Sequence, residues 1–143
     1  MSEYTYAPTQ TIAVGGSAIF NNSIPCNRGN VFHRNESGIF ILKGNTNNPC
    51  QNFARYQVVF NGNIAVPTGE TVGPVSVALS LGGEAITTSE AIVTPTVVDA
   101  FFNVTSTLIA DVPSCTSLTL SLENTSVIPI SLSNANLTIS RIA

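Results

Sequence analysis

Residues 62–86 read GNIAVPTGETVGPVSVALSLGGEAI, and this stretch decides how we interpret the whole chain. Between Val75 and Leu81 every second residue is a valine or leucine, and a serine or alanine stands between each pair. Strict alternation of this kind is typical of a β-strand with one buried face. Gly82-Gly83 follows at once, which predicts a tight hairpin into another strand. Pro67-Thr68-Gly69 closes an earlier strand, so the middle of the chain is predicted to be three strands joined by turns.

The composition of the chain suits β-structure throughout. The chain has 143 residues, enough for one domain with one core. It is 43% hydrophobic and only 9% charged, whereas about 25% is typical. Serine, threonine, asparagine and glutamine must therefore cover the solvated faces. No segment has a helical period, so we expect an all-β fold with no helix longer than about two turns.

Charge and hydropathy exclude two classes of partner. The five lysines and arginines are spread thinly and form no basic patch, which excludes nucleic-acid binding. No apolar run approaches the roughly 18 residues of a membrane span, so no membrane partner is expected. The first ten residues, MSEYTYAPTQ, lack the basic start and apolar stretch of a secretory signal. We therefore expect synthesis in the cytoplasm and a final place in a virion or an extracellular surface assembly, reached without a signal peptide.

Alternation and turn residues predict further strands along the rest of the chain. Those strands cover residues 11–20, 31–34, 39–43, 53–66, 86–93, 97–112, 118–122 and 128–139. In the last of them, apolar residues occupy even positions up to Leu132 and odd positions from Leu137. A β-bulge near Ser133-Asn134 is required if this is one strand.

The number and spacing of these strands indicate the fold class. Many short strands with frequent turns predict a sandwich or a barrel. An antiparallel two-sheet jelly-roll sandwich fits best, and an up-and-down barrel is the alternative. Residues 1–10 are polar and are expected to form an N-terminal arm, ahead of a single jelly-roll domain over residues 11–143.

Three cysteines leave two interpretations open. Cys26 and Cys50 each follow a proline in an asparagine-rich loop, and Cys115 stands apart. Either all three are free thiols, or Cys26 and Cys50 form a disulfide with Cys115 left over. Such a bridge would add about 3 kcal/mol in the chain-entropy model. A metal site built from the cysteines and His33 lacks any C-x-x-C spacing, so we expect no metal and no cofactor.

The sequence offers no catalytic signature. His33 is the only histidine, and no G-x-S-x-G motif supplies a nucleophile for it. The acidic residues are scattered among strand ends without a distinct pair. We therefore expect His33 to be a surface or interface residue, and we expect no catalytic residues and no enzyme activity.

Three stretches carry a resemblance to a known superfamily. They are residues 61–86, residues 97–113 (VVDAFFNVTSTLIADVP), and SLENTS followed by ANLTISRI over residues 121–142. From about Thr11 onward the chain resembles the jelly-roll heads of complement proteins and tumour necrosis factor, in particular their bacterial and bacteriophage members. The resemblance implies a homotrimer in which one sheet of each protomer faces the axis. In many members of this superfamily a collagen-like stalk carries the head. This sequence contains no Gly-X-Y repeat, so we expect residues 1–10 or the sides of the head to attach it.

Two functions follow as hypotheses. The first is a non-enzymatic assembly protein, most concretely a homotrimeric bacteriophage virion component such as a head decoration, head fibre or tail-associated protein. Its partners would be itself and capsid, tail or other surface-assembly proteins. The alternative is a carbohydrate- or receptor-binding head domain of a phage fibre or spore-surface protein, with glycans as partners.

The candidate interface residues are aromatic and aliphatic. Tyr4 and Tyr6 stand in the expected arm and are assigned to a subunit contact. Tyr56, Val58 and Phe60 share one face of the 53–66 strand. They line either a subunit interface or the ordinary core between the sheets, and the sequence does not separate the two.

Overall fold

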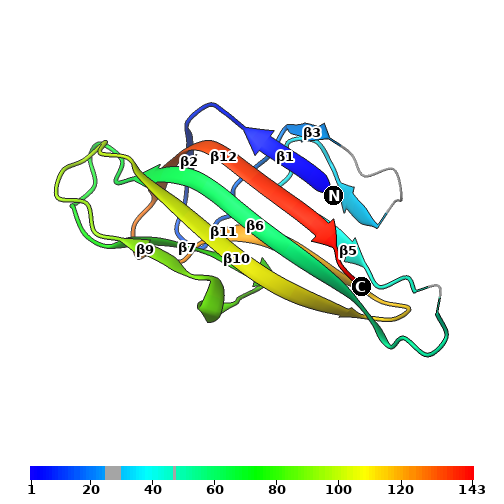
Figure 1. Ribbon diagram of the computed structural model, residues 1–143. Coiled ribbons are helices and arrows are strands. Elements are labelled where there is room, and N and C mark those ends of the chain that lie inside the picture. Colours follow the sequence, from blue (N-terminus) through cyan, green and yellow to red (C-terminus); the bar gives the residue numbers. More distant parts are fainter. Residues whose placement is uncertain (25–29, 47) are drawn as a thin grey trace.

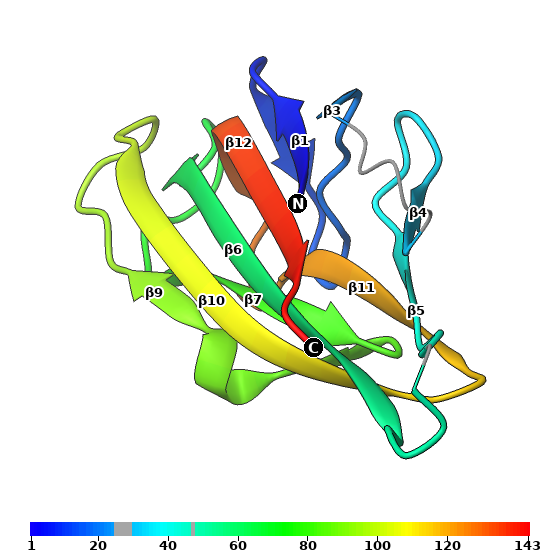
Figure 2. The same cartoon turned by 45° about the vertical axis from the view of Figure 1, so that its right-hand side comes forward.

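The computed structural model describes residues 1–24, 30–46 and 48–143. These residues form two six-stranded antiparallel sheets that pack face to face (Figures 1 and 2). The predicted all-β, antiparallel two-sheet jelly-roll sandwich is confirmed. The helix that the described residues contain is a single 3-10 turn, η1 (Thr87–Ser89). In this part of the chain, no helix has the length and apolar character needed to cross a membrane.

The first sheet, sheet A, places the long strands of the molecule side by side (Figure 1). Its strand order is β10-β6-β12-β1-β3, and β2 pairs with the first part of β12. The bounds are β1 (Ser2–Tyr6), β2 (Gln10–Ile12), β3 (Asn22–Ile24), β6 (Phe53–Ala65), β10 (Phe102–Pro113) and β12 (Ile130–Arg141).

The second sheet, sheet B, lies behind the first and is built mostly of short strands (Figure 2). Its order is β4-β5-β11-β7-β8, and β9 pairs with the first part of β7. The bounds are β4 (Val31–His33), β5 (Phe40–Lys43), β7 (Val75–Leu81), β8 (Glu84–Ala85), β9 (Ala91–Val93) and β11 (Ser117–Asn124).

The N-terminal residues lie inside sheet A, which differs from the expected arm. β1 pairs with β12 on one side and with β3 on the other. Tyr4 is only 4% exposed, and its ring meets Phe40 of sheet B edge-on at 4.6 Å. With only five residues, β1 is too short for its pattern of apolar and polar side chains to distinguish a strand from a flexible tail. The partner strand β12, more than 120 residues later, supplies the burial.

The predicted bulge in the last strand is confirmed. The register between β12 and β6 shifts between Ser133 and Asn136. Asn134 has a φ of 52°, the left-handed backbone that a bulge residue adopts. The shift keeps Leu132 and Leu137, on opposite sequence parities, inside the same core.

Other predicted strands are shorter in the structure. Residues 97–101 form a turn before β10, because Asp99 adopts a φ of 57° and its N–H bonds to the carbonyl of Val66 at 2.8 Å. Residues 86–93 divide into η1 and β9. The segment 11–20 contains β2 and then a turn at Gly15, whose φ is 72°.

β7 and the hairpin that follows it correspond to the strand and turn predicted from residues 75–86. The glycine turn is confirmed, since Gly82 and Gly83 both have positive φ and join β7 to β8. The expectation of one exposed face is wrong, because residues 75–80 are all buried. Ser126 and Ser89 fold over the strand and bond its backbone at Ser76 and Leu79.

The core fills the space between the two sheets. Sheet A contributes inward side chains from β6, β10 and β12, and sheet B contributes them from β5, β7 and β11. The largest fully buried side chains are Tyr56, Phe20, Phe40, Phe60, Leu42, Ile64, Leu79, Leu120, Leu122, Ile130, Leu132 and Leu137.

Candidate functional site

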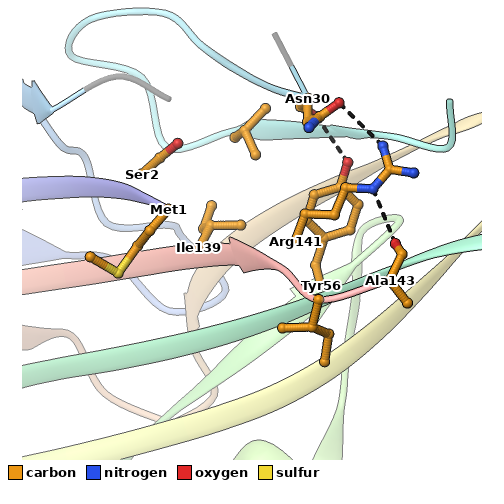
Figure 3. Close-up of a pocket in the computed structure, with 9 residues that line it drawn as sticks. Met1, Ser2, Asn30, Tyr56, Ile139, Arg141 and Ala143 are labelled. Atoms are coloured by element: carbon orange, nitrogen blue, oxygen red, sulfur yellow. Dashed lines mark hydrogen bonds between the residues drawn. The ribbon is translucent and has the colours of Figure 1, made fainter. Parts of the chain in front are cut away.

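A cavity of about 550 Å³ opens at the end of the sandwich where β1 begins and β12 ends (Figure 3). Its volume lies within the range of small-molecule sites, about 300–1,000 Å³. The lining residues are Met1, Ser2, Asn30, Val31, Tyr56, Ile139, Arg141, Ile142 and Ala143. They come from β1, β6, β12 and the start of β4, so the cavity exists only once both sheets have formed.

Tyr56 forms the rigid floor of this pocket. Its side chain is fully buried in β6 and spans from sheet A to sheet B. The phenol oxygen lies 2.5 Å from the carbonyl oxygen of Lys43 and 3.1 Å from that of Asn30. These contacts hold the end of β5 and the residue before β4 against β6, which fixes the backbone at Asn30.

Arg141 supplies the charge at the pocket (Figure 3). Its Nη1 donates to Oδ1 of Asn30 at 3.2 Å, and its Nε donates to the carbonyl of Ala143 at 3.0 Å. A guanidinium carries five N–H donors. These two bonds leave donors available at a half-buried position, and the planar group is held in one orientation by its partners.

Ser2 brings a buried hydroxyl to the same cavity. The residue is 1% exposed, and its Oγ has no hydrogen-bond partner in the described part of the chain. An unpaired buried polar group costs about 1–3 kcal/mol. Val31, Ile139 and Ile142 form the apolar wall beside these polar groups.

A second polar surface covers the outer face of sheet A. Asn103 donates to Asn61 at 2.7 Å and to Asn63 at 3.1 Å, and Asn63 donates to Asn134 at 3.3 Å. These amides largely satisfy one another. The pocket offers unsatisfied donors and acceptors instead, which makes it the stronger candidate for binding a ligand.

The structure places the expected interface residues in or against the core. Tyr56, Val58 and Phe60 are fully buried between the sheets, which is the second of the two alternatives. Tyr4 is also buried, and Tyr6 is partly buried against the same core. Of these residues, Tyr56 contributes to the candidate site.

His33 packs as an aromatic ring. It stacks on Phe40 with centroids 4.3 Å apart and meets Tyr4 edge-on at 5.0 Å. Its Nε2 lies 2.9 Å from the carbonyl oxygen of Ser37. The ring is half-buried and joins β4, β5 and β1.

Two of the cysteines are described, and both are exposed. Cys26 lies outside the described residues, so the Cys26–Cys50 disulfide stays a prediction. Within the described ranges, no group of three or more histidine, cysteine, aspartate or glutamate side chains could hold a metal ion.

Sequence reasoning did not identify Ser2, Asn30 or Arg141 as site residues. They are separated by most of the chain and belong to no motif. Each lies at the border of a strand, where a polar residue is ordinary. Only the pairing of β1 with β12 and the docking of β4 bring them together.

No protein-family model matches the sequence, and no curated protein does. Among solved structures, one similar chain is the xylan-binding domain CBM22-1 of Xyn10C from Paenibacillus barcinonensis. It is 14% identical, with a TM-score of 0.40, over 99% of this chain and 94% of that one.

Another similar structure is the C-terminal domain of the sugar-binding protein EclA. It is 13% identical, with a TM-score of 0.37, over 80% of this chain and 86% of that one. Likeness at this level assigns no ligand to this chain. The β-sandwich part of the sequence resemblance agrees with the fold, and membership of the complement and tumour-necrosis-factor superfamily stays a prediction.

Proposed function

We propose that this chain is a carbohydrate-binding domain whose ligand lies in the pocket formed by Ser2, Asn30 and Arg141. The observation that carries the proposal is an open cavity that presents the Arg141 guanidinium and the Asn30 amide beside an apolar wall, with the buried Ser2 hydroxyl behind them. This corresponds to the second of the two functions considered from the sequence.

The pocket matches the chemistry of a saccharide. Sugar hydroxyls both donate and accept, so they can accept from the guanidinium of Arg141 and from the side-chain amide of Asn30. The C–H faces of a sugar ring are apolar and suit the wall made by Val31, Ile139 and Ile142. The cavity volume suits a short saccharide or the end of a longer glycan.

Binding without turnover is part of the proposal. Glycoside hydrolysis requires a pair of carboxylate side chains on either side of the scissile bond. Among the described lining residues, no aspartate, glutamate, histidine or cysteine side chain is present. The groups at hand can hold and orient a sugar, and they offer no side-chain acid or base for its cleavage.

The wider setting stays a prediction. A bacteriophage virion role, a homotrimer, and a surface location reached without a signal peptide are expectations from sequence and resemblance. A glycan-binding head on a fibre or a spore surface is compatible with each of them.

A glycan array probed with the full chain tests the proposal. Glycans that bind would then be measured by titration calorimetry with Arg141→Met and Asn30→Ala. Hydrogen bonds to a charged group contribute about 1.5–3 kcal/mol, so Arg141→Met should weaken binding by about ten-fold or more. Arg34→Met is the matched control. Arg34 is exposed and is not among the residues that line the pocket, so this variant loses the same charge at a different place.

Three outcomes would contradict the pocket assignment. They are an absence of binding to any glycan, equal loss in Arg141→Met and Arg34→Met, or binding that only Asn103→Ala abolishes. The last result would place the ligand on the outer face of sheet A. Thermal melts of each variant would establish that the folded domain is the species measured.

A further inference from the structure

β10 is a long strand at the free edge of sheet A. It pairs with β6 without a break from Phe102 to Pro113. Just beyond it, Ser114 N–H donates to the carbonyl of Asn52 in the same register. Since backbone groups alternate in direction along an antiparallel pair, even-numbered residues of β10 bond to β6.

The odd-numbered residues therefore present their backbone groups to the free edge. These residues are Asn103, Thr105, Thr107, Ile109 and Asp111, and all of them are exposed. Within the described ranges, no other backbone or side chain bonds to their N–H or C=O groups. The edge is an open row of donors and acceptors.

This edge differs from every other edge that the structure describes. β2, β3, β4 and β9 have three residues each, and β8 has two, whereas β10 has twelve. Natural proteins protect sheet edges by shortening them or by adding lysine, proline or a bulge. β10 contains no lysine, and its one proline is the last residue, Pro113. Its only charge, on Asp111, is paired with Arg55 at 2.7 Å.

A hollow lies at the middle of β10. It has a volume of about 410 Å³ and lies next to Thr107–Ile109, bordered by Gln57 and Thr88. η1 packs against the inward face of β10, where the buried Ser106 hydroxyl donates to the carbonyl of Ser89.

We propose, in place of the homotrimer that the sequence resemblance implies, that β10 pairs antiparallel with β10 of a second copy, about a two-fold axis through Thr107. This register is the one that engages all of the exposed residues at once. It sets Thr107 opposite itself, Thr105 opposite Ile109, and Asn103 opposite Asp111. The Asn103 side chain then lies opposite the Asp111–Arg55 pair at each end, and the two Asp111 side chains stay apart.

The resulting contact is closed and self-complementary. A two-fold contact of one surface with itself ends the assembly at two copies. The two copies of sheet A become one continuous sheet, and each Asp111 carries its own Arg55 into the seam, so the seam adds no net charge. The candidate pocket lies at β1 and β12 and is not used.

Cysteine cross-linking tests the register directly. Opposed residues in a hydrogen-bonded antiparallel pair have Cα atoms about 5.5 Å apart, within disulfide reach. With Cys26, Cys50 and Cys115 replaced by serine, Thr107→Cys should oxidise to a covalent dimer. Thr105→Cys alone should not, whereas Thr105→Cys combined with Ile109→Cys should.

Two further variants test the association itself by sedimentation and light scattering. Thr107→Pro removes an N–H that is unpaired within the chain, so it blocks the seam and spares the ladder with β6. Thr107→Lys places two like charges opposite each other on the axis. Each should shift a dimer, of twice 15.0 kDa, to the monomer. Thr119→Lys, exposed on β11 of sheet B, is the control and should remain dimeric.

The result expected is a dimer that both Thr107 variants dissociate while their far-UV spectra and melting profiles stay those of a folded domain. A monomer of the unmodified chain at micromolar concentration would overturn the proposal. So would a stable trimer, or a dimer that Thr107→Lys leaves intact. Equal cross-linking of Thr105→Cys and Thr107→Cys would reject the register.

Discussion

The side-chain nitrogen of Asn124 lies 3.1 Å from the carbonyl oxygen of Ile12, although 112 residues separate them. The same nitrogen lies 3.0 Å from the carbonyl of Ile128, and Oδ1 accepts from Ser126 N–H at 2.9 Å. Asn124 is 1% exposed. One buried amide thus joins β2, the end of β11 and the turn that precedes β12.

Asn124→Ala should lower the free energy of unfolding by about 1–3 kcal/mol. The physical reason is that several backbone groups lose a partner at a buried position. Urea denaturation followed by circular dichroism measures the change. Asn35→Ala is the control, since Asn35 is exposed and should leave the midpoint almost unchanged. Equal midpoints for the two variants would contradict a structural role for Asn124.

Tyr4→Ala should destabilise the fold by about 3–5 kcal/mol, as expected for a buried aromatic residue. The ring packs against Phe40 and His33, and it belongs to β1 within sheet A. Thr5→Ala, on the half-exposed outward face of the same strand, should cost far less. Chemical denaturation of both variants decides the question. A Tyr4→Ala protein as stable as the unmodified one would favour a dispensable arm.

Gly44→Ala should be among the most disruptive small substitutions. A Cβ at this position would lie 2.1 Å from the carbonyl oxygen of Pro113, a backbone atom that cannot rotate away. Either β5 or the turn after β10 must shift, and overpacking of this kind costs about 1–3 kcal/mol or more. Gly73→Ala is the matched control because no atom lies within 4 Å of its Cβ position. Melting temperatures of the two variants should differ clearly.

The pKa of Asp111 should be lower in the folded protein than in the unfolded chain. The main cause is the hydrogen bond from the Arg55 guanidinium. A lowered folded-state pKa gives a stabilising contribution that is complete above the unfolded-state pKa and lost as pH falls through the folded-state value. Both side chains are exposed, so this contribution is small and weakens further with added salt.

Carboxyl titration by NMR measures this shift. In the Arg55→Met variant, the pKa of Asp111 should move up toward its ordinary range. The stability difference between the unmodified chain and Asp111→Asn should also shrink as the pH becomes acidic. An Asp111 pKa that does not respond to Arg55→Met would show that the ion pair is absent in solution.

The sequence by itself determined the fold class and several local features. Alternation in residues 75–81 specifies a strand, and two glycines with positive φ make its hairpin. The parity change between Leu132 and Leu137 required a bulge, which lies between Ser133 and Asn136. Such features depend on the chain's neighbours in sequence, because side-chain direction in a strand repeats every two residues.

Only the tertiary structure decided where the polar ends of the chain meet. Ser2, Asn30 and Arg141 form one pocket because β1 pairs with β12 and β4 docks beside them. It also decided that Tyr56 is core, and that β10 is the long open edge. Strand alternation states which face of a strand is buried, and it does not state which strand lies alongside. The pairing of strands that are far apart in the sequence is fixed by the sum of many contacts over both sheets. A binding site formed by residues of such strands therefore has no motif in any one stretch of the sequence.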